Sequence, residues 1–249
     1  MRRVISSTLV LCASLISPAG IAGESPLFLS ERIESMLTKQ EHPLTARQKL
    51  MSFIAAQAAT GDMPKLNVAL QQGLDSGLTV SDCREVLVQL YAYAGFPRSL
   101  NALGELMKVV EARKAQGIQD AEGQLPGPRP APDEMLAIGT QNQTALVGQP
   151  VKGPLFDFAP AADEYLKTHL FGDIFSRDNL DWKSRELATV GTLSAISGVE
   201  PQLKAHLGMS MNVGLTRSQL AELVPFFEEK GEPVFAQRLQ AALASLNAQ

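Results

Sequence analysis

Apolar residues recur at helical spacing along most of the chain. In the C-terminal half they fall at Leu187, Val190, Leu193 and Ile196. This spacing predicts one face of a helix, and Asp181 is placed to cap its first turn. A break at Gly198 follows, Pro201 suits the first turn of the next helix, and Gly214 is a typical residue just beyond a helix end. We therefore predict two consecutive helices joined by a short turn.

The rest of the chain shows similar patterns, bounded by capping and breaking residues. They predict helices over 30–36, 45–59, 64–76, 79–95, 98–113, 133–145 and 161–175. The Pro- and Gly-rich stretch 117–132 is predicted to be a linker or an extended arm, and 148–160 to be a loop. Because no segment alternates strictly between apolar and polar residues, we predict an all-α protein.

An internal repeat underlies this pattern. Residues 44–87 align without a gap with residues 181–224, with 11 identical pairs in 44 positions. Several of the pairs are helix breakers or caps, such as Gly61/Gly198 and Pro64/Pro201. We predict two tandem helical repeats over 23–113 and 136–249, with a linker over 114–135 and a signal peptide over 1–22.

Residues 1–22 have the layout of a secretory signal peptide. Arg2 and Arg3 precede an apolar run over 4–16, and small residues lead up to Ala22. We expect cleavage near Ala22 and a periplasmic or secreted protein, with no membrane segment after cleavage. The remaining chain would carry 22 − 2 = 20 basic and 26 acidic residues, which argues against a nucleic-acid partner.

Five residues of the second repeat are candidates for a small-molecule site. His206 and Glu186 lie on consecutive helices that are expected to pack together, which predicts an acid–base pair. The alternatives are a histidine packed in the core and an acidic residue favoured at the start of a helix. Arg185 is a candidate for binding a substrate carboxylate, and the alternative is that it lies on the surface without a functional role. Trp182 and Asn212 are candidates for substrate contact, with packing and helix capping as the alternatives.

The first repeat lacks the three main candidates. The residues opposite Glu186, Arg185 and His206 are Lys49, Gln48 and Ala69. This asymmetry predicts that the second repeat carries the functional site and that the first repeat has a structural role.

Other chemistry has little support in the sequence. The three histidines are scattered without a metal-ligand pattern, so we expect neither a metal nor an organic cofactor. His169 is expected to have a packing or capping role. Only Cys83 would survive signal cleavage, which leaves no CxxC pair, and its apolar neighbours predict a buried thiol.

The motifs resemble those of the carboxymuconolactone decarboxylase family. The second repeat contains SREL from Ser184, then Gly198, His206 and NVGLT ending at Thr216, and the first contains YAGFPRSLNAL from Tyr93. The resemblance implies an all-helical unit that assembles as trimers or hexamers of units, so that a trimer of two-repeat chains is expected. One branch of the family resembles alkyl hydroperoxidase D and uses a cysteine pair, which this chain lacks.

The other branch resembles the decarboxylase itself, and Glu186 and His206 match its positions. This implies a lyase or isomerase that acts on a carboxylated lactone by acid–base chemistry. Two alternatives remain at the level of sequence, an antioxidant of the hydroperoxidase type and a ligand-binding or assembly protein without turnover.

Overall fold

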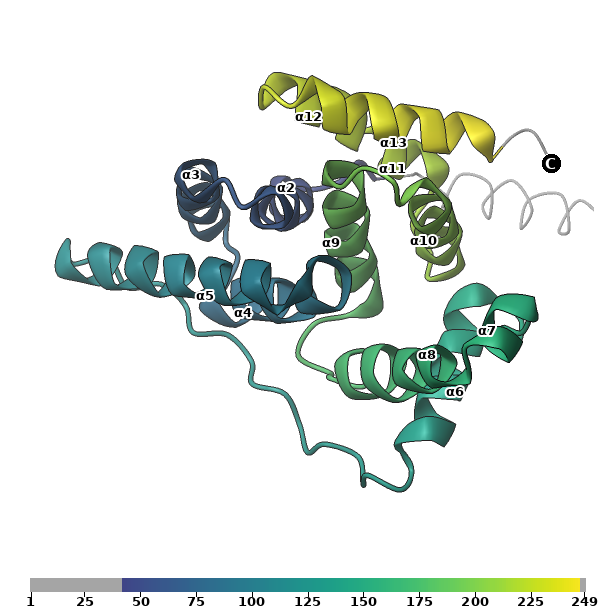
Figure 1. Ribbon diagram of the computed structural model, residues 1–249. Coiled ribbons are helices and arrows are strands. Elements are labelled where there is room, and N and C mark those ends of the chain that lie inside the picture. The colour runs from purple at the N-terminus through teal and green to yellow at the C-terminus, as the bar shows by residue number, and fades with distance from the viewer. Residues whose placement is uncertain (1–41, 247–249) are drawn as a thin grey trace, which may run out of the picture. The chain divides into compact units, whose positions relative to one another are not determined.

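Residues 42–246 are described by a computed structural model of the chain (Figure 1). They belong to one compact unit that starts at His42. The predicted signal peptide over 1–22 and the predicted short helix over 30–36 lie outside the described residues.

All regular secondary structure between residues 42 and 246 is helical, which confirms the predicted all-α class. The elements are α2 (Ala46–Thr60), α3 (Met63–Asp75), α4 (Val80–Gln89), α5 (Tyr91–Ala115), α6 (Met135–Val147), α7 (Pro154–Phe158), α8 (Pro160–Tyr165), the π-helix η1 (Leu166–Ile174), α9 (Trp182–Ala195), α10 (Glu200–Asn212), α11 (Arg217–Ala221), α12 (Leu223–Glu229) and α13 (Pro233–Ser245). Within this part of the chain, no helix combines the length and the apolar character needed to cross a membrane.

Local sequence signals fix the starts and ends of the principal helices. Thr45 caps α2 in a capping box, in which its side chain accepts from the Gln48 backbone N–H and the Gln48 side chain accepts from the Thr45 backbone N–H. Gly61 ends α2 in the left-handed region, at φ 75°. Thr79 and Thr216 cap α4 and α11 with boxes of the same kind.

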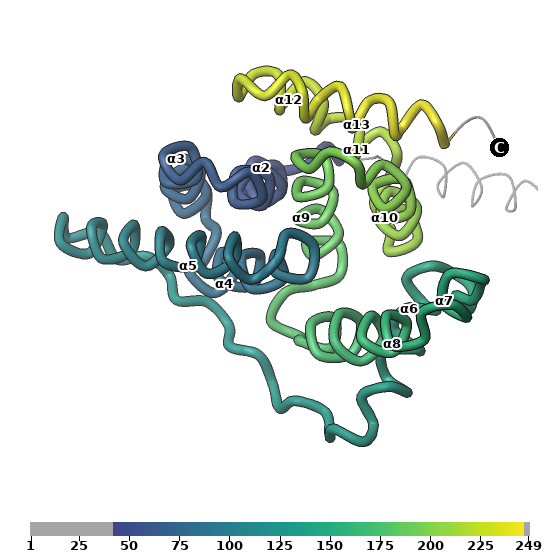
Figure 2. The backbone as a smooth tube through the Cα atoms, in the orientation of Figure 1, coloured from purple at the N-terminus to yellow at the C-terminus, as the bar shows by residue number. Residues whose placement is uncertain are grey.

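The helices of the two predicted repeats pack against each other. α2 and α9 lie side by side at the centre, with α3, α4 and α5 on one side and α10 and α13 on the other (Figures 1 and 2). Gly191 permits the close approach of α9 to α2, because a Cβ at this position would lie 2.0 Å from the Ser52 carbonyl oxygen. α3 and α10 are offset by 200 − 63 = 137 residues at their starts and 212 − 75 = 137 at their ends, the same offset that aligns the repeats in the sequence. The duplication itself stays a prediction.

Two segments differ from the sequence-based expectation. The predicted loop over 148–160 contains the short helix α7, which Pro154 opens. The helix predicted over 161–175 divides into α8 and the wider turns of η1. η1 lies so close to α6 that a Cβ on Gly139 would be 1.7 Å from the Lys167 carbonyl oxygen, so its course depends on a tertiary contact that periodicity does not contain.

The Pro- and Gly-rich stretch is an extended arm that is fastened to its neighbours. The backbone N–H groups of Val80 and Ser81, at the start of α4, donate to the carbonyls of Ala121 and Glu122, each at 2.9 Å. Further along, the Gly127 N–H donates to the carboxylate of Asp178 at 2.7 Å. The arm therefore runs across the surface in a fixed position before α6 begins.

Candidate active site

Glu186 and His206 are held by the two consecutive helices that the sequence predicted. Asp181 caps α9 by accepting from the Ser184 N–H at 2.9 Å, which places Glu186 in the second turn of the helix. α10 brings His206 back toward α9 after the turn at Gly198, where φ is +81°. The short connection thus makes the two side chains neighbours.

The two side chains form a buried hydrogen-bonded pair. His206 Nδ1 lies 2.9 Å from Glu186 Oε2, and their side chains are 7% and 0% exposed. Because a carboxylate only accepts, Nδ1 carries the hydrogen and the neutral ring presents Nε2 as an acceptor. Among residues 42–246 no hydrogen bond to Nε2 is found, which leaves this acceptor unpaired.

Unpaired polar atoms lie around this pair. Glu186 Oε1 and the hydroxyl of Tyr93 are buried and have no hydrogen-bond partner in the described part of the chain. The Tyr93 ring meets the His206 ring edge-on, with centroids 5.4 Å apart. Burial and the nearby charge of Glu186 raise the pKa of Tyr93, so its hydroxyl stays protonated and can donate. Buried polar groups are normally paired, and unpaired ones mark functional sites or sites for water.

The setting of Arg185 differs from the one expected from the sequence. Its side chain is fully buried, and its Nη2 donates to Glu85 Oε2 at 3.1 Å and to the Arg177 carbonyl at 3.0 Å. Its Nη1 donates to Gln89 Oε1 at 3.3 Å. These contacts do not support the predicted clamp for a substrate carboxylate, although the buried Nε has no partner among the described residues. The surface alternative is wrong, because the guanidinium is buried and binds groups inside the protein.

Glu85 is the centre of this internal network. Arg177 donates to both of its carboxylate oxygens, at 2.8 and 2.6 Å, and Arg185 reaches it from the other side. Burial acts to raise the pKa of Glu85, but the hydrogen bonds and charges of the two arginines, aided by Asn179, outweigh it and lower the pKa. Burial lowers the pKa of Arg185, which nevertheless remains charged at neutral pH. Glu85, Arg177 and Arg185 thus form an ionised triad at the contact between α4 and α9.

This triad should make the protein sensitive to acid. The pKa of Glu85 is lower in the folded protein than the ordinary value of 4.5, so its stabilising contribution is complete above that value and is lost as the pH falls through the folded pKa. We expect the urea midpoint of unfolding to decline as the pH falls below 4.5, the ordinary pKa of a glutamate. In the Glu85→Gln variant the midpoint at neutral pH should be lower and the decline shallower. An equal decline in both proteins would assign the acid sensitivity to other carboxylates.

The two remaining predicted contacts serve the packing of the helices. Trp182 donates from Nε1 to the Phe175 carbonyl at 2.9 Å and packs edge-on against the Phe175 ring. Asn212 donates to the Leu146 carbonyl at 2.8 Å, in the last turn of α6. Neither geometry supports the predicted role in substrate contact, and both agree with the packing and capping alternatives.

His169 has a different setting from the one expected. It lies on η1, half-exposed, between Tyr91 and Asp173, and it lines cavities rather than the core. Among the described residues, no group of three or more His, Cys, Asp or Glu side chains is placed to hold a metal ion.

Comparison with known proteins points to the same segment. The carboxymuconolactone decarboxylase family profile matches residues 160–226, which include Glu186 and His206. The chain is 33% identical over 70 residues to the 4-carboxymuconolactone decarboxylase of Acinetobacter baylyi (strain ATCC 33305 / BD413 / ADP1). This alignment covers 28% of the present chain and 52% of that relative, so the chain spans about half of the relative's length. Residues 160–226 thus form a segment that is similar to the carboxymuconolactone decarboxylase family.

Proposed function

We propose that this protein is a small-molecule lyase or isomerase that acts on a carboxylated lactone. The observation that carries the proposal is the buried Glu186–His206 pair, with its 2.9 Å hydrogen bond and a free Nε2. The name of the relative from Acinetobacter baylyi supports decarboxylation as the reaction. In this proposal Glu186 sets the imidazole tautomer and His206 exchanges the proton.

The reaction needs one proton and a place for negative charge. Loss of CO₂ breaks the bond between the carboxylate and a ring carbon, and the electron pair remains as an enolate. Nε2 of the neutral His206 ring takes up a proton from solvent, and the imidazolium so formed gives this proton to the carbon, which returns the ring to its neutral form. The Tyr93 hydroxyl, which is buried and without a partner in the described residues, is the group we propose to donate to the enolate oxygen.

The antioxidant alternative finds no support in the setting of Cys83. This thiol is completely buried, and burial raises its pKa to about 12. Because the thiolate is the reactive form, such a cysteine is a poor nucleophile toward peroxide.

The direct test is release of CO₂ from 4-carboxymuconolactone. We expect turnover by the purified protein without added metal or cofactor. The absence of turnover with this lactone and with related carboxylated lactones would contradict the proposed reaction. Thermal stabilisation by a lactone without CO₂ release would instead favour the non-catalytic, ligand-binding alternative.

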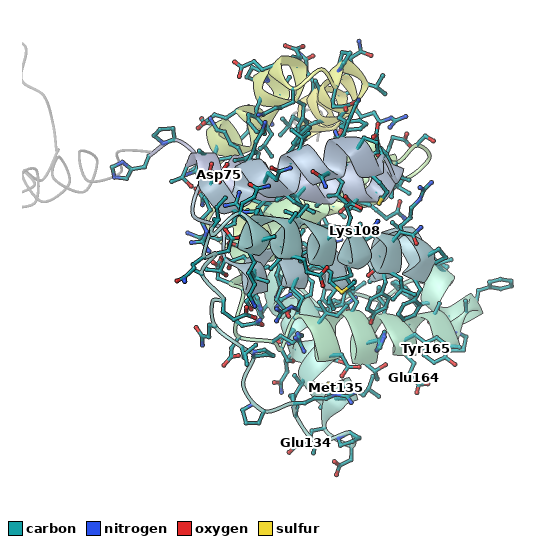
Figure 3. The ribbon with its side chains drawn as sticks, turned by 90° about the vertical axis from the view of Figure 1, so that its left-hand side faces the viewer. Asp75, Lys108, Glu134, Met135, Glu164 and Tyr165 are labelled. Atoms are coloured by element: carbon teal, nitrogen blue, oxygen red, sulfur yellow. The ribbon has the colours of Figure 1, made fainter. Side chains whose placement is uncertain are left out.

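We also propose that the protein is exported and assembles with itself. The signal-peptide pattern over 1–22 supports export. Large apolar side chains are exposed on α7 and α8, with Phe158 at 89%, Leu155 at 70% and Tyr165 at 68% (Tyr165 is labelled in Figure 3). Three large apolar side chains exposed on two short consecutive helices support an interface between chains.

The expected assembly is a trimer of chains. Light scattering coupled to size-exclusion chromatography should give a mass three times that of the mature chain. Replacing Phe158 with Glu should lower this mass by placing a charge in the proposed interface. A monomeric mass for the unmodified protein would contradict the trimer.

A further inference from the structure

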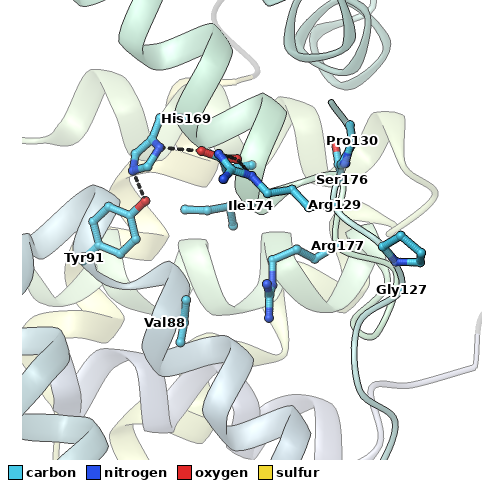
Figure 4. Close-up of a pocket in the computed structure, with 11 residues that line it drawn as sticks. Val88, Tyr91, Gly127, Arg129, Pro130, His169, Ile174, Ser176 and Arg177 are labelled. Atoms are coloured by element: carbon cyan, nitrogen blue, oxygen red, sulfur yellow. Dashed lines mark hydrogen bonds and ion pairs between the residues drawn. The ribbon is translucent and has the colours of Figure 1, made fainter. Parts of the chain in front are cut away.

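A cavity with charged groups lies where the extended arm passes over η1 and the start of α5. Its volume is about 340 Å³, within the range of small-molecule sites (Figure 4). Val88, Ile174 and prolines of the arm form its apolar wall, and Arg129, Arg177, Tyr91 and His169 supply polar groups. The proposed reaction uses none of these residues.

A chain of hydrogen bonds crosses one side of this cavity. His169 Nδ1 lies 2.8 Å from Asp173 Oδ2, and His169 Nε2 contacts the Tyr91 hydroxyl (Figure 4). Because Asp173 accepts from Nδ1, the neutral imidazole accepts the Tyr91 hydrogen at Nε2. Two of these residues, His169 and Asp173, lie in the π-helix, a conformation that is frequent at functional sites. Half of the His169 side chain is exposed, so a ligand can reach this chain of groups.

A second, more apolar cavity begins on the other side of Tyr91 and His169. Its volume is about 620 Å³, and both residues line it as well as the first cavity. Phe96 stacks on Tyr91 with ring centroids 4.4 Å apart, and Tyr165 and Leu166 extend the apolar wall. The hydrogen-bonded Tyr91–His169 pair therefore lines both a charged compartment and an apolar one.

The charged compartment contains groups of both signs, and the Asp178 carboxylate lies beside it, bound by the Gly127 N–H and acting on the charge of Arg177. Its lining contains two arginines and one carboxylate, Asp173, while Glu85 behind Arg177 is balanced by the buried Arg185. Arg129 bonds Asp173 through Nε and Nη2, and Arg177 bonds Glu85 through the same two atoms. Within residues 42–246, Nη1 of each guanidinium has no hydrogen-bond partner. Two charged donors are thus available for an anion.

We propose that these two cavities form one binding site for an organic acid with a single carboxylate and an apolar ring. The carboxylate binds Arg129 and Arg177 in the first cavity, and the ring lies beyond Tyr91 against Phe96 in the second. This site is independent of the Glu186–His206 pair and does not rest on the proposed decarboxylation.

Benzoate is a suitable probe, and benzyl alcohol is its uncharged counterpart. Because the chain has only three histidines, the imidazole signals of the ¹⁵N-histidine-labelled protein can be assigned with single His→Gln variants. We expect benzoate to shift the His169 signals and to leave those of His206 in place. Benzyl alcohol should bind at least about tenfold more weakly, because it lacks the charge that the arginines bind.

The matched variants are Arg129→Gln and Arg84→Gln. Each removes one ion pair between the arm and a helix, with Asp173 for Arg129 and with Glu122 for Arg84, but only Arg129 lines the proposed site. Arg129→Gln should weaken benzoate binding by about tenfold or more, and Arg84→Gln should leave it unchanged. Equal losses in both variants, unchanged binding in Arg129→Gln, no binding of benzoate, or shifts of His206 in place of His169 would each overturn the proposal.

Discussion

Replacing His206 with glutamine is expected to lower kcat/KM for lactone decarboxylation by about 10²- to 10⁴-fold, the range for loss of a positioned acid or base. Glutamine can still donate a hydrogen bond to Glu186, but it cannot carry and release a proton near neutral pH. The initial rate of CO₂ release, measured below and above KM, gives both kinetic constants. A fall in kcat at unchanged KM would indicate that His206 acts in the transition state and not in binding.

The control for this variant is His42→Gln. His42 is exposed at the start of the described chain, and only its backbone carbonyl forms a hydrogen bond, with Gln219. This change should leave both kinetic constants as they are. Both variants should keep the helical circular dichroism spectrum and the thermal midpoint within a few degrees of the parent. Unchanged turnover in His206→Gln would remove the proposed proton donor, and with it the role assigned to Glu186.

Local signals explain why most of the helices could be predicted. Caps and breakers such as Thr45, Gly61 and Gly198 act within a few residues, and the structure has them where the sequence predicts. The Glu186–His206 contact was also predictable, because a short turn between consecutive helices leaves few ways to pack them. The π-helix could not be predicted from the sequence, because its wide turns coincide with the approach of Gly139 to the Lys167 backbone.

Long-range partners explain what the sequence could not predict. The partner of Arg185 is Glu85, 100 residues earlier, and no local pattern distinguishes this arginine from one on the surface. The His169–Asp173 spacing of four residues is a visible helical signal, but Tyr91 and the arm residue Arg129 come from distant positions. The partners of Trp182 and Asn212 could not be predicted for the same reason, because they are backbone carbonyls of other elements.

The Glu85→Ala variant should show the largest loss of stability. It leaves the fully buried guanidinium of Arg185 without its counter-charge, and breaking a buried ion pair in this way costs about 3–5 kcal/mol. Against a typical total stability of about 5–15 kcal/mol, this loss should shift the urea midpoint strongly. The matched control is Glu122→Ala, which breaks the exposed pair with Arg84 and should cost less than about 1 kcal/mol.

A second variant separates the charge from the lost packing. If the penalty arises from an uncompensated buried cation, then adding Arg185→Met to Glu85→Ala should recover most of it, because apolar residues replace a buried ion pair at little cost. Arg177, which is partly exposed, can turn its guanidinium to water in both variants. If the double variant is as unstable as Glu85→Ala alone, then the Glu85 side chain acts through packing or through Arg177. The charge of Arg185 would then contribute little to the stability of the α4–α9 contact.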